Sequence, residues 1–154
     1  MRKQFVHSTD CDDIEMGVRR EINGSRVYVT PEGNTYPSIT SILGRQPKPG
    51  IEAWKEKVGY QEASRIMKES SALGTMVHGL CEDYLYNEDL QCDDKEAISV
   101  FNRLRFLLGN IDNIQCIEAP LHSDILKVAG TADCIAEYNG VLSVIDFKRS
   151  EERR

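Results

Sequence analysis

The sequence predicts an α/β fold of α+β-like order, with helices packed on a small mixed β-sheet. In the middle of the chain, apolar residues recur at three- and four-residue intervals, which is typical of amphipathic helices. The last forty residues instead hold short apolar runs around Asn139-Gly140, a dipeptide that favours a tight hairpin turn. At 154 residues the chain suits one domain, which we divide into 1–44, 45–110 and 111–150.

The first segment, 1–44, is expected to form a hairpin and a short helix. Residues 21–22 and 27–30 have strand character and flank the turn dipeptide Asn23-Gly24. Ser38 precedes a short apolar run that ends near Gly44, which predicts a helix with Ser38 as its N-cap.

The second segment, 45–110, is expected to be helical after a loop at 46–50. The spacing predicts helices over 51–59, 60–70 and 73–86, and a further helix that begins at Asp93 or Asp94 and ends at Gly109-Asn110. Trp54 and Tyr36 have two interpretations, stacking on nucleic-acid bases or packing, and for Trp54 we prefer packing in the core.

The third segment, 111–150, is expected to be a meander of three strands, over 115–122, 127–137 and 141–147. Residues two apart on a strand point to the same face, so Asp146 and Lys148 look the same way. A hairpin also brings Asp133 to the same end of the sheet. Two carboxylates and an amine that converge in this way suit metal-assisted hydrolysis of a phosphodiester.

The composition limits the classes of function. The net charge is −6 and the pI about 5.1, unlike proteins that bind duplex DNA by bulk electrostatics. Arg and Lys do fall in clusters, of which Arg19-Arg20 is the first, and each cluster is either a local path for phosphates or a solvated face. We find no secretory signal, transit peptide or apolar run long enough to span a membrane, and expect a cytoplasmic protein.

The five cysteines contain no Cys-x-x-Cys pair, so we expect reduced thiols rather than a zinc site. Cys134 adjoins Asp133 and is expected to point to the opposite face of its strand.

A helical pair and two strand motifs together resemble the RecB-like branch of the PD-(D/E)XK nuclease superfamily, in its phage-encoded exonuclease type. The mitochondrial genome maintenance exonucleases have a similar layout. The resemblance covers roughly 25–150 and rests on blocks in the family's order: Tyr36-Pro37-Ser38-Ile39-Thr40-Ser41-Ile42-Leu43, Trp54-x-x-x-Val58-Gly59, Gly74-Thr75-x-x-His78-x-x-x-Glu82, Gly130-Thr131-x-Asp133 and Asp146-Phe147-Lys148.

The resemblance implies a restriction-endonuclease-like nuclease core and a role for each matching position. Asp133, Asp146 and Lys148 would be catalytic, with Lys148 positioning the attacking water. The metal, Mg²⁺ or Mn²⁺, would be held by His78, Asp133, Asp146 and the carbonyl of Phe147.

Further positions have weaker expectations. Glu82 and Glu118 are candidates for supporting the ligands from behind, although for Glu118 we slightly prefer a surface strand residue. Ser38, Thr40 and Ser41 either contact DNA phosphates or cap their helix. Arg149 stands where many relatives have a small polar residue, and either touches phosphate or is exposed.

The resemblance implies a metal-dependent DNA exonuclease that acts on single-stranded or frayed ends in phage DNA recombination, repair or degradation, in the cytoplasm of a bacterial host. The chain ends six residues after Lys148, where related cores continue, so we expect a C-terminally truncated core with scope for self-association. The alternative is a catalytically impaired module on the same scaffold that binds DNA ends or another protein.

Overall fold

The computed structural model describes residues 3–8 and 17–148, and its contacts divide the chain into two compact units. The helical unit contains 47–110 together with 3–5 and 147–148 of the described residues. The sheet unit contains 6–8, 17–46 and 111–146. Each unit is described by itself.

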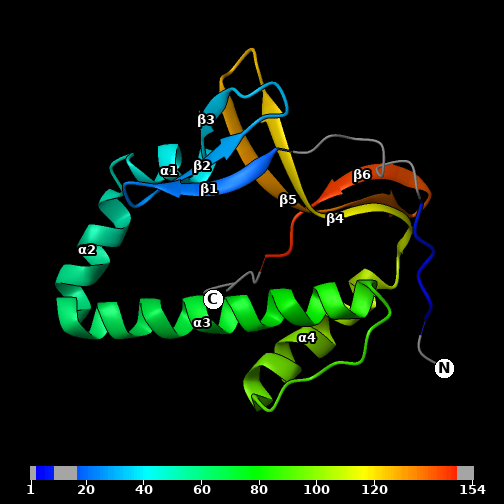
Figure 1. The fold of residues 1–154 in the computed structure, drawn as a ribbon. Coiled ribbons are helices and arrows are strands. Elements are labelled where there is room, and N and C mark those ends of the chain that lie inside the picture. Colours follow the sequence, from blue (N-terminus) through cyan, green and yellow to red (C-terminus); the bar gives the residue numbers. More distant parts are fainter. Residues whose placement is uncertain (1–2, 9–16, 149–154) are drawn as a thin grey trace. The chain divides into compact units, whose positions relative to one another are not determined.

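Three helices make up the helical unit: α2 (Pro49–Val58), α3 (Tyr60–Leu85) and α4 (Lys95–Leu108) (Figure 1). The expected break between 70 and 73 is wrong, because α3 runs through it as one helix of 26 residues. The segment holds no proline, and an isolated glycine such as Gly74 is tolerated inside a helix. Helix α2 begins inside the expected loop, with Pro49 at a first-turn position that needs no backbone donor.

The core of the helical unit lies between α3 and α4. The ring of Tyr84 meets Phe5 edge-on at 5.1 Å and Phe101 at 5.6 Å, measured between ring centroids. Asp94 caps α4 as predicted, since its carboxylate accepts a 2.8 Å hydrogen bond from the backbone N–H of Ala97. Trp54 is only half-buried, so the expectation that it packs in the core is wrong.

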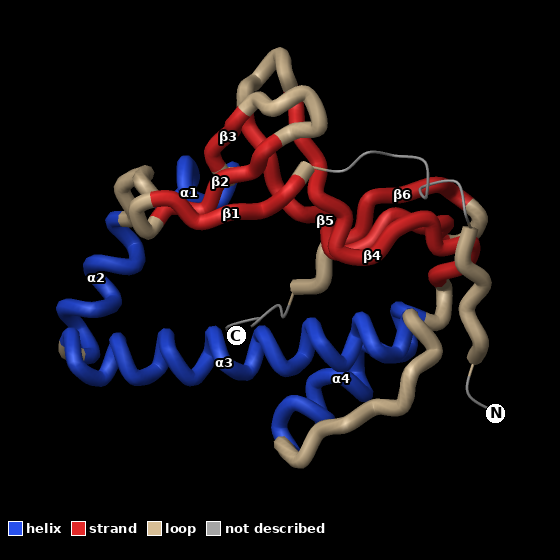
Figure 2. Tube along the Cα trace, viewed as in Figure 1, coloured by secondary structure: helices blue, strands red, loops and turns tan. Residues whose placement is uncertain are grey.

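The sheet unit contains two antiparallel sheets of three strands and one short helix, α1 (Ile39–Gly44) (Figure 2). The first sheet consists of β1 (Val18–Ile22), β2 (Ser25–Val29) and β3 (Thr35–Pro37). Asn23 and Gly24 connect β1 to β2 with φ values of 50° and 72°, the left-handed pair that a tight hairpin needs.

The second sheet is a meander as expected, formed by β4 (Ile111–Ser123), β5 (Val128–Tyr138) and β6 (Val141–Ile145). The expected end of the third strand at 147 is wrong, because β6 ends at Ile145, and so the strand alternation that was to align Asp146 with Lys148 does not apply. Asn139 and Gly140 again take positive φ values, 51° and 77°, and connect β5 to β6. The α+β-like class is therefore confirmed.

The expectation of one mixed sheet needs correction. Among the described strands all pairing within the two sheets is antiparallel, and parallel contact is limited to isolated bridges, His7 with Ile114 and Ser38 with Ala129. The reason is the length of the connections: tight turns join antiparallel neighbours, whereas parallel strands need a crossover of a dozen or more residues.

The two sheets contact each other inside the sheet unit through a small cluster of Tyr28, Tyr36 and Ala129. The hydroxyls of Tyr28 and Thr131 lie 2.9 Å apart, and Tyr36 donates a 2.5 Å hydrogen bond to Asp124. Tyr36 is 8% exposed, so it is not free to stack on bases as one interpretation required. Within the described residues, no helix is long and apolar enough to cross a membrane.

Candidate metal centre

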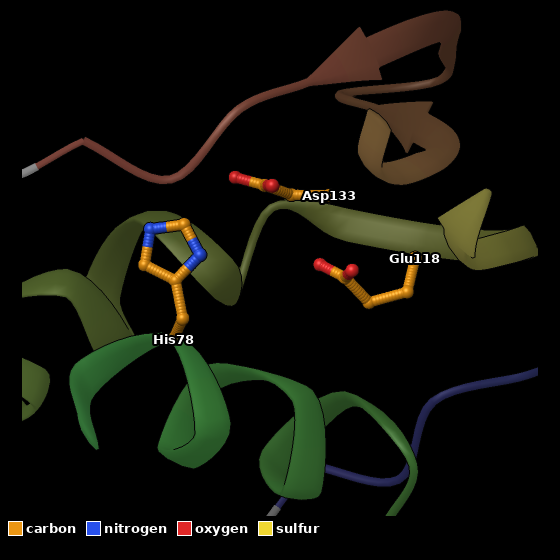
Figure 3. Close-up of side chains that lie close together, drawn as sticks. All are labelled: His78, Glu118 and Asp133. Carbon is orange, nitrogen blue, oxygen red and sulfur yellow. The ribbon is translucent and has the colours of Figure 1, made fainter. Parts of the chain in front are cut away.

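Two carboxylates face each other across the β4–β5 ladder. Ile117 pairs with Cys134 and Ala119 pairs with Ala132, so Glu118 stands opposite Asp133. One carboxylate oxygen from each lies within 4.8 Å of the other (Figure 3). A cation midway would be about 2.4 Å or less from each oxygen, in the range of metal–oxygen bonds for Mg²⁺ and Ca²⁺.

A third carboxylate follows the β5–β6 ladder. The last pair of that ladder is Cys134 with Ile145, and Asp146 comes directly after it, beyond the end of β6. Extrapolated by one residue, the register would set Asp146 across from Asp133, on the side away from Glu118. We therefore keep Asp146 as a candidate third member of this acidic row.

Glu118 has a backbone conformation that glutamate seldom adopts. Its φ is 53°, a left-handed value that is uncommon for residues other than glycine, asparagine and aspartate. Such strain is concentrated at functional sites, where the surroundings hold it in place. Like charges directly opposite in a ladder also disfavour folding. A divalent cation between the two oxygens would turn that repulsion into attraction, so the donor set fits a hard cation.

The opposite face of β5 is buried and apolar. Cys134 has no exposed surface, as expected from its position next to Asp133. Burial raises the pKa of its thiol to about 12, with smaller contributions from Cys116 and the charge of Asp133. Cys134 is therefore a neutral core residue, and the donors of this row are oxygen atoms.

The predicted residues of the helical unit are His78, Glu82, Phe147 and Lys148. His78 and Glu82 lie one turn apart on α3, and both are half-buried. The imidazole projects from the helix (Figure 3), and its ring meets Phe147 edge-on with centroids 5.9 Å apart. Phe147 is 6% exposed and Lys148 is exposed, so the side chain of Phe147 serves packing while its neighbour reaches solvent.

The predicted DNA-contacting residues are in different environments. Ser38 is 1% exposed, and its hydroxyl lies 2.7 Å from that of Thr40. Ser38 occupies the N-cap position of α1 but makes no side-chain capping bond, so that part of the capping interpretation is wrong. Thr40 is exposed and Ser41 half-buried, and both line an open groove with three arginines. Arg149 lies outside the described residues.

Sequence reasoning gave Glu118 a supporting or a surface role and did not connect Arg26 with any site. A signal for Glu118 was present, because pairs across a hairpin have a constant sum of residue numbers. A turn around 125–126 makes 118 the partner of 133. Without a turn dipeptide such as Asn-Gly there, the centre of that hairpin could not be fixed.

The proteins that this chain resembles are exonucleases of genome maintenance. It is similar to mitochondrial genome maintenance exonuclease 1 of Mus musculus, with 27% identity over 142 residues, 86% of this chain and 42% of that protein. The Homo sapiens protein of the same name is 27% identical over 130 residues, 77% of this chain and 38% of its own length. The Xenopus tropicalis protein of that name is 29% identical over 129 residues, which are 77% of this chain and 37% of that protein.

This chain therefore spans about two fifths of the length of these curated relatives. No protein-family model matches the sequence.

Proposed function

We propose that the chain is the nuclease domain of a metal-dependent DNA exonuclease, formed by residues 1–154. The observation that carries this proposal is the pair of Glu118 and Asp133, opposite each other across β4 and β5, and Asp146 is proposed as a third carboxylate one residue beyond β6. The printed names of the relatives support an exonuclease. The RecB-like PD-(D/E)XK assignment, the phage context, the bacterial cytoplasm and the preference for single-stranded or frayed ends belong to the same proposal.

His78 is proposed as the ligand that the helical unit contributes. In the arrangement that we propose, the imidazole of His78 would complete the set begun by Glu118 and Asp133, whose carboxylate oxygens lie within 4.8 Å of each other. Two carboxylates and one imidazole suit Mn²⁺ or Mg²⁺. This assigns Glu118 a direct role, rather than the supporting one first expected.

The remaining residues have roles around these ligands. A bound divalent cation would polarise the phosphodiester. It would also lower the pKa of water, so that hydroxide is available to attack the phosphorus. The ammonium of Lys148 would orient the water and offset the charge that develops on phosphate oxygens. The carbonyl of Phe147 is a further oxygen donor, and its buried ring fixes that backbone. Glu82, one turn from His78, would orient the imidazole through its second ring nitrogen.

The decisive assay follows end-labelled single-stranded DNA on a gel with Mg²⁺, Mn²⁺ or EDTA. We expect metal-dependent shortening, and a loss of at least a hundredfold in Asp133→Asn, because a metal ligand becomes a neutral amide. Glu137→Gln is the matched control: it neutralises a carboxylate on the same strand and the same face, four residues away.

Cleavage by Asp133→Asn at the wild-type rate would overturn the assignment. Metal-independent cleavage would do the same. DNA binding without any cleavage by the folded wild type would support the second candidate, a catalytically impaired module that binds DNA ends. The observation behind that candidate is the groove lined by Arg19, Arg26, Thr40 and Ser41, which would bind DNA whether or not the carboxylates act.

A further inference from the structure

An open groove of about 490 Å³ lies on the sheet unit, between the β1–β2 hairpin and α1. Its lining residues differ from those to which the proposed chemistry assigns a role. Its lining is largely polar and consists of Arg19, Arg20, Glu21, Gly24, Arg26, Thr40 and Ser41.

The strand register explains why these residues meet. Alternation puts Arg19 and Glu21 on one face of β1, and the pairing of Glu21 with Arg26 brings Arg26 to that face. A 3.1 Å hydrogen bond from the backbone N–H of Ser38 to the carbonyl of Arg26 then joins the start of α1 to β2. Thr40 and Ser41 thereby line the same groove as Arg26.

The groove is a positive site on an acidic chain. By alternation Arg20 lies on the other face of β1, so Arg19 and Arg26 against Glu21 give the groove face a net charge of about +1, whereas the whole chain carries −6. In the described part of the chain, no ion pair joins Arg19, Arg20 or Arg26 to a carboxylate. Arg65 shows the contrast, since Glu62 and Glu69 hold it at 2.7 and 2.6 Å.

We propose that this groove binds the sugar–phosphate backbone of a DNA strand and holds it on the sheet unit. The inference deepens the proposed function and rests on it for the choice of DNA. Guanidinium groups present paired donors that match phosphate oxygens, and hydroxyls are common donors to the same atoms. The groove is open rather than enclosed, which suits a continuous polymer. Thr40 and Ser41 thus contact phosphate, whereas the buried Ser38 only positions α1.

The test measures binding of a fluorescein-labelled oligo-dT strand by anisotropy in EDTA, where cleavage cannot contribute. Arg19→Gln combined with Arg26→Gln removes two groove cations. Arg103→Gln combined with Lys68→Gln removes two exposed cations from the helical unit and is the charge-matched control. Circular dichroism confirms that all three proteins are folded to the same extent, and a gel assay with Mn²⁺ is run in parallel on the wild type.

We expect the groove variant to bind the strand more weakly than the wild type. The magnitude of its slope of log affinity against log salt should be smaller by about 1.4, because each lost phosphate contact on a single strand lowers it by about 0.7. The ratio of wild-type affinity to variant affinity should therefore fall about sevenfold between 50 and 200 mM salt. The control pair should keep the wild-type slope. Three results would overturn the proposal that the groove binds DNA. They are an equal loss of affinity in the control pair, an unchanged salt slope in the groove variant, and a wild type that does not bind the strand.

The parallel gel separates the two proposals. If the wild type cleaves DNA and the groove variant binds it normally, the groove proposal is refuted and the nuclease proposal stands. If the groove variant binds more weakly but the wild type shows no metal-dependent cleavage, the nuclease proposal is refuted and the groove stands as a DNA-binding site.

Discussion

Replacement of Glu118 by glutamine should weaken the binding of Mn²⁺ at least tenfold. Glu118→Gln keeps the shape of the side chain and one oxygen donor but removes a unit charge. With the two carboxylate oxygens within 4.8 Å, a cation midway between them would lie at most about 2.4 Å from each. The lost attraction is then about 3.5 kcal/mol even at the dielectric constant of water, which corresponds to a factor of about 300. The amide oxygen recovers part of this, so we expect a tenfold to 300-fold change.

Thermal unfolding of the protein in EDTA and in excess MnCl₂ measures this effect, because a ligand that binds only the folded state raises its stability. A tenfold larger dissociation constant removes about 1.4 kcal/mol of that stabilisation when the concentration of Mn²⁺ exceeds the dissociation constants of both the wild type and the variant. For a chain of this size the Mn²⁺-dependent rise in Tm should shrink by about 3–6 °C. Glu137→Gln, on the neighbouring strand, should keep the full rise. An unchanged rise in Glu118→Gln would refute the reasoning and return Glu118 to the role of a surface strand residue.

Three further predictions concern stability, and chemical denaturation measures each. Asp94→Ala should lower the unfolding free energy by about 1 kcal/mol, because α4 loses its cap, whereas Asp93→Ala should change it little. Phe101→Ala should cost about 3–5 kcal/mol, since this ring is 2% exposed, while Phe106→Ala, at 85% exposed, serves as its near-neutral control. Gly17→Ala should be destabilising, because an added Cβ would lie 2.8 Å from a backbone oxygen of β2 that cannot move aside; equal stability would show that the hairpin adjusts.

The strands were predictable where turn chemistry was explicit. Asn23-Gly24 and Asn139-Gly140 fix two hairpins and their registers, so Asp133 and Asp146 could be aligned in advance. The β4–β5 turn has no such dipeptide, and the position of Glu118 therefore had to come from the structure. Its positive φ is set by tertiary context and leaves no trace in the local sequence.

The helices were predictable in place but not in extent. Apolar spacing located α3, yet the polar residues between 67 and 73 hid its continuity, because propensity alone does not decide a short polar stretch. The groove was harder still. Arg19-Arg20 stood out as a basic cluster, but only the β1–β2 register shows that Arg26 joins it.

The acidic row comes from one unbroken stretch of chain, between Glu118 and Asp146. Insertions and deletions therefore act on it very unevenly. One residue added within β5 between Asp133 and the Asn139-Gly140 turn would shift the pairing by one position and turn a carboxylate to the other face of the sheet. Extra residues in the segment between α3 and α4 leave the row intact. Length variation among natural homologues should accordingly be absent from β5 and common at 86–94, so that the positions of gaps, as well as residue identities, mark the site.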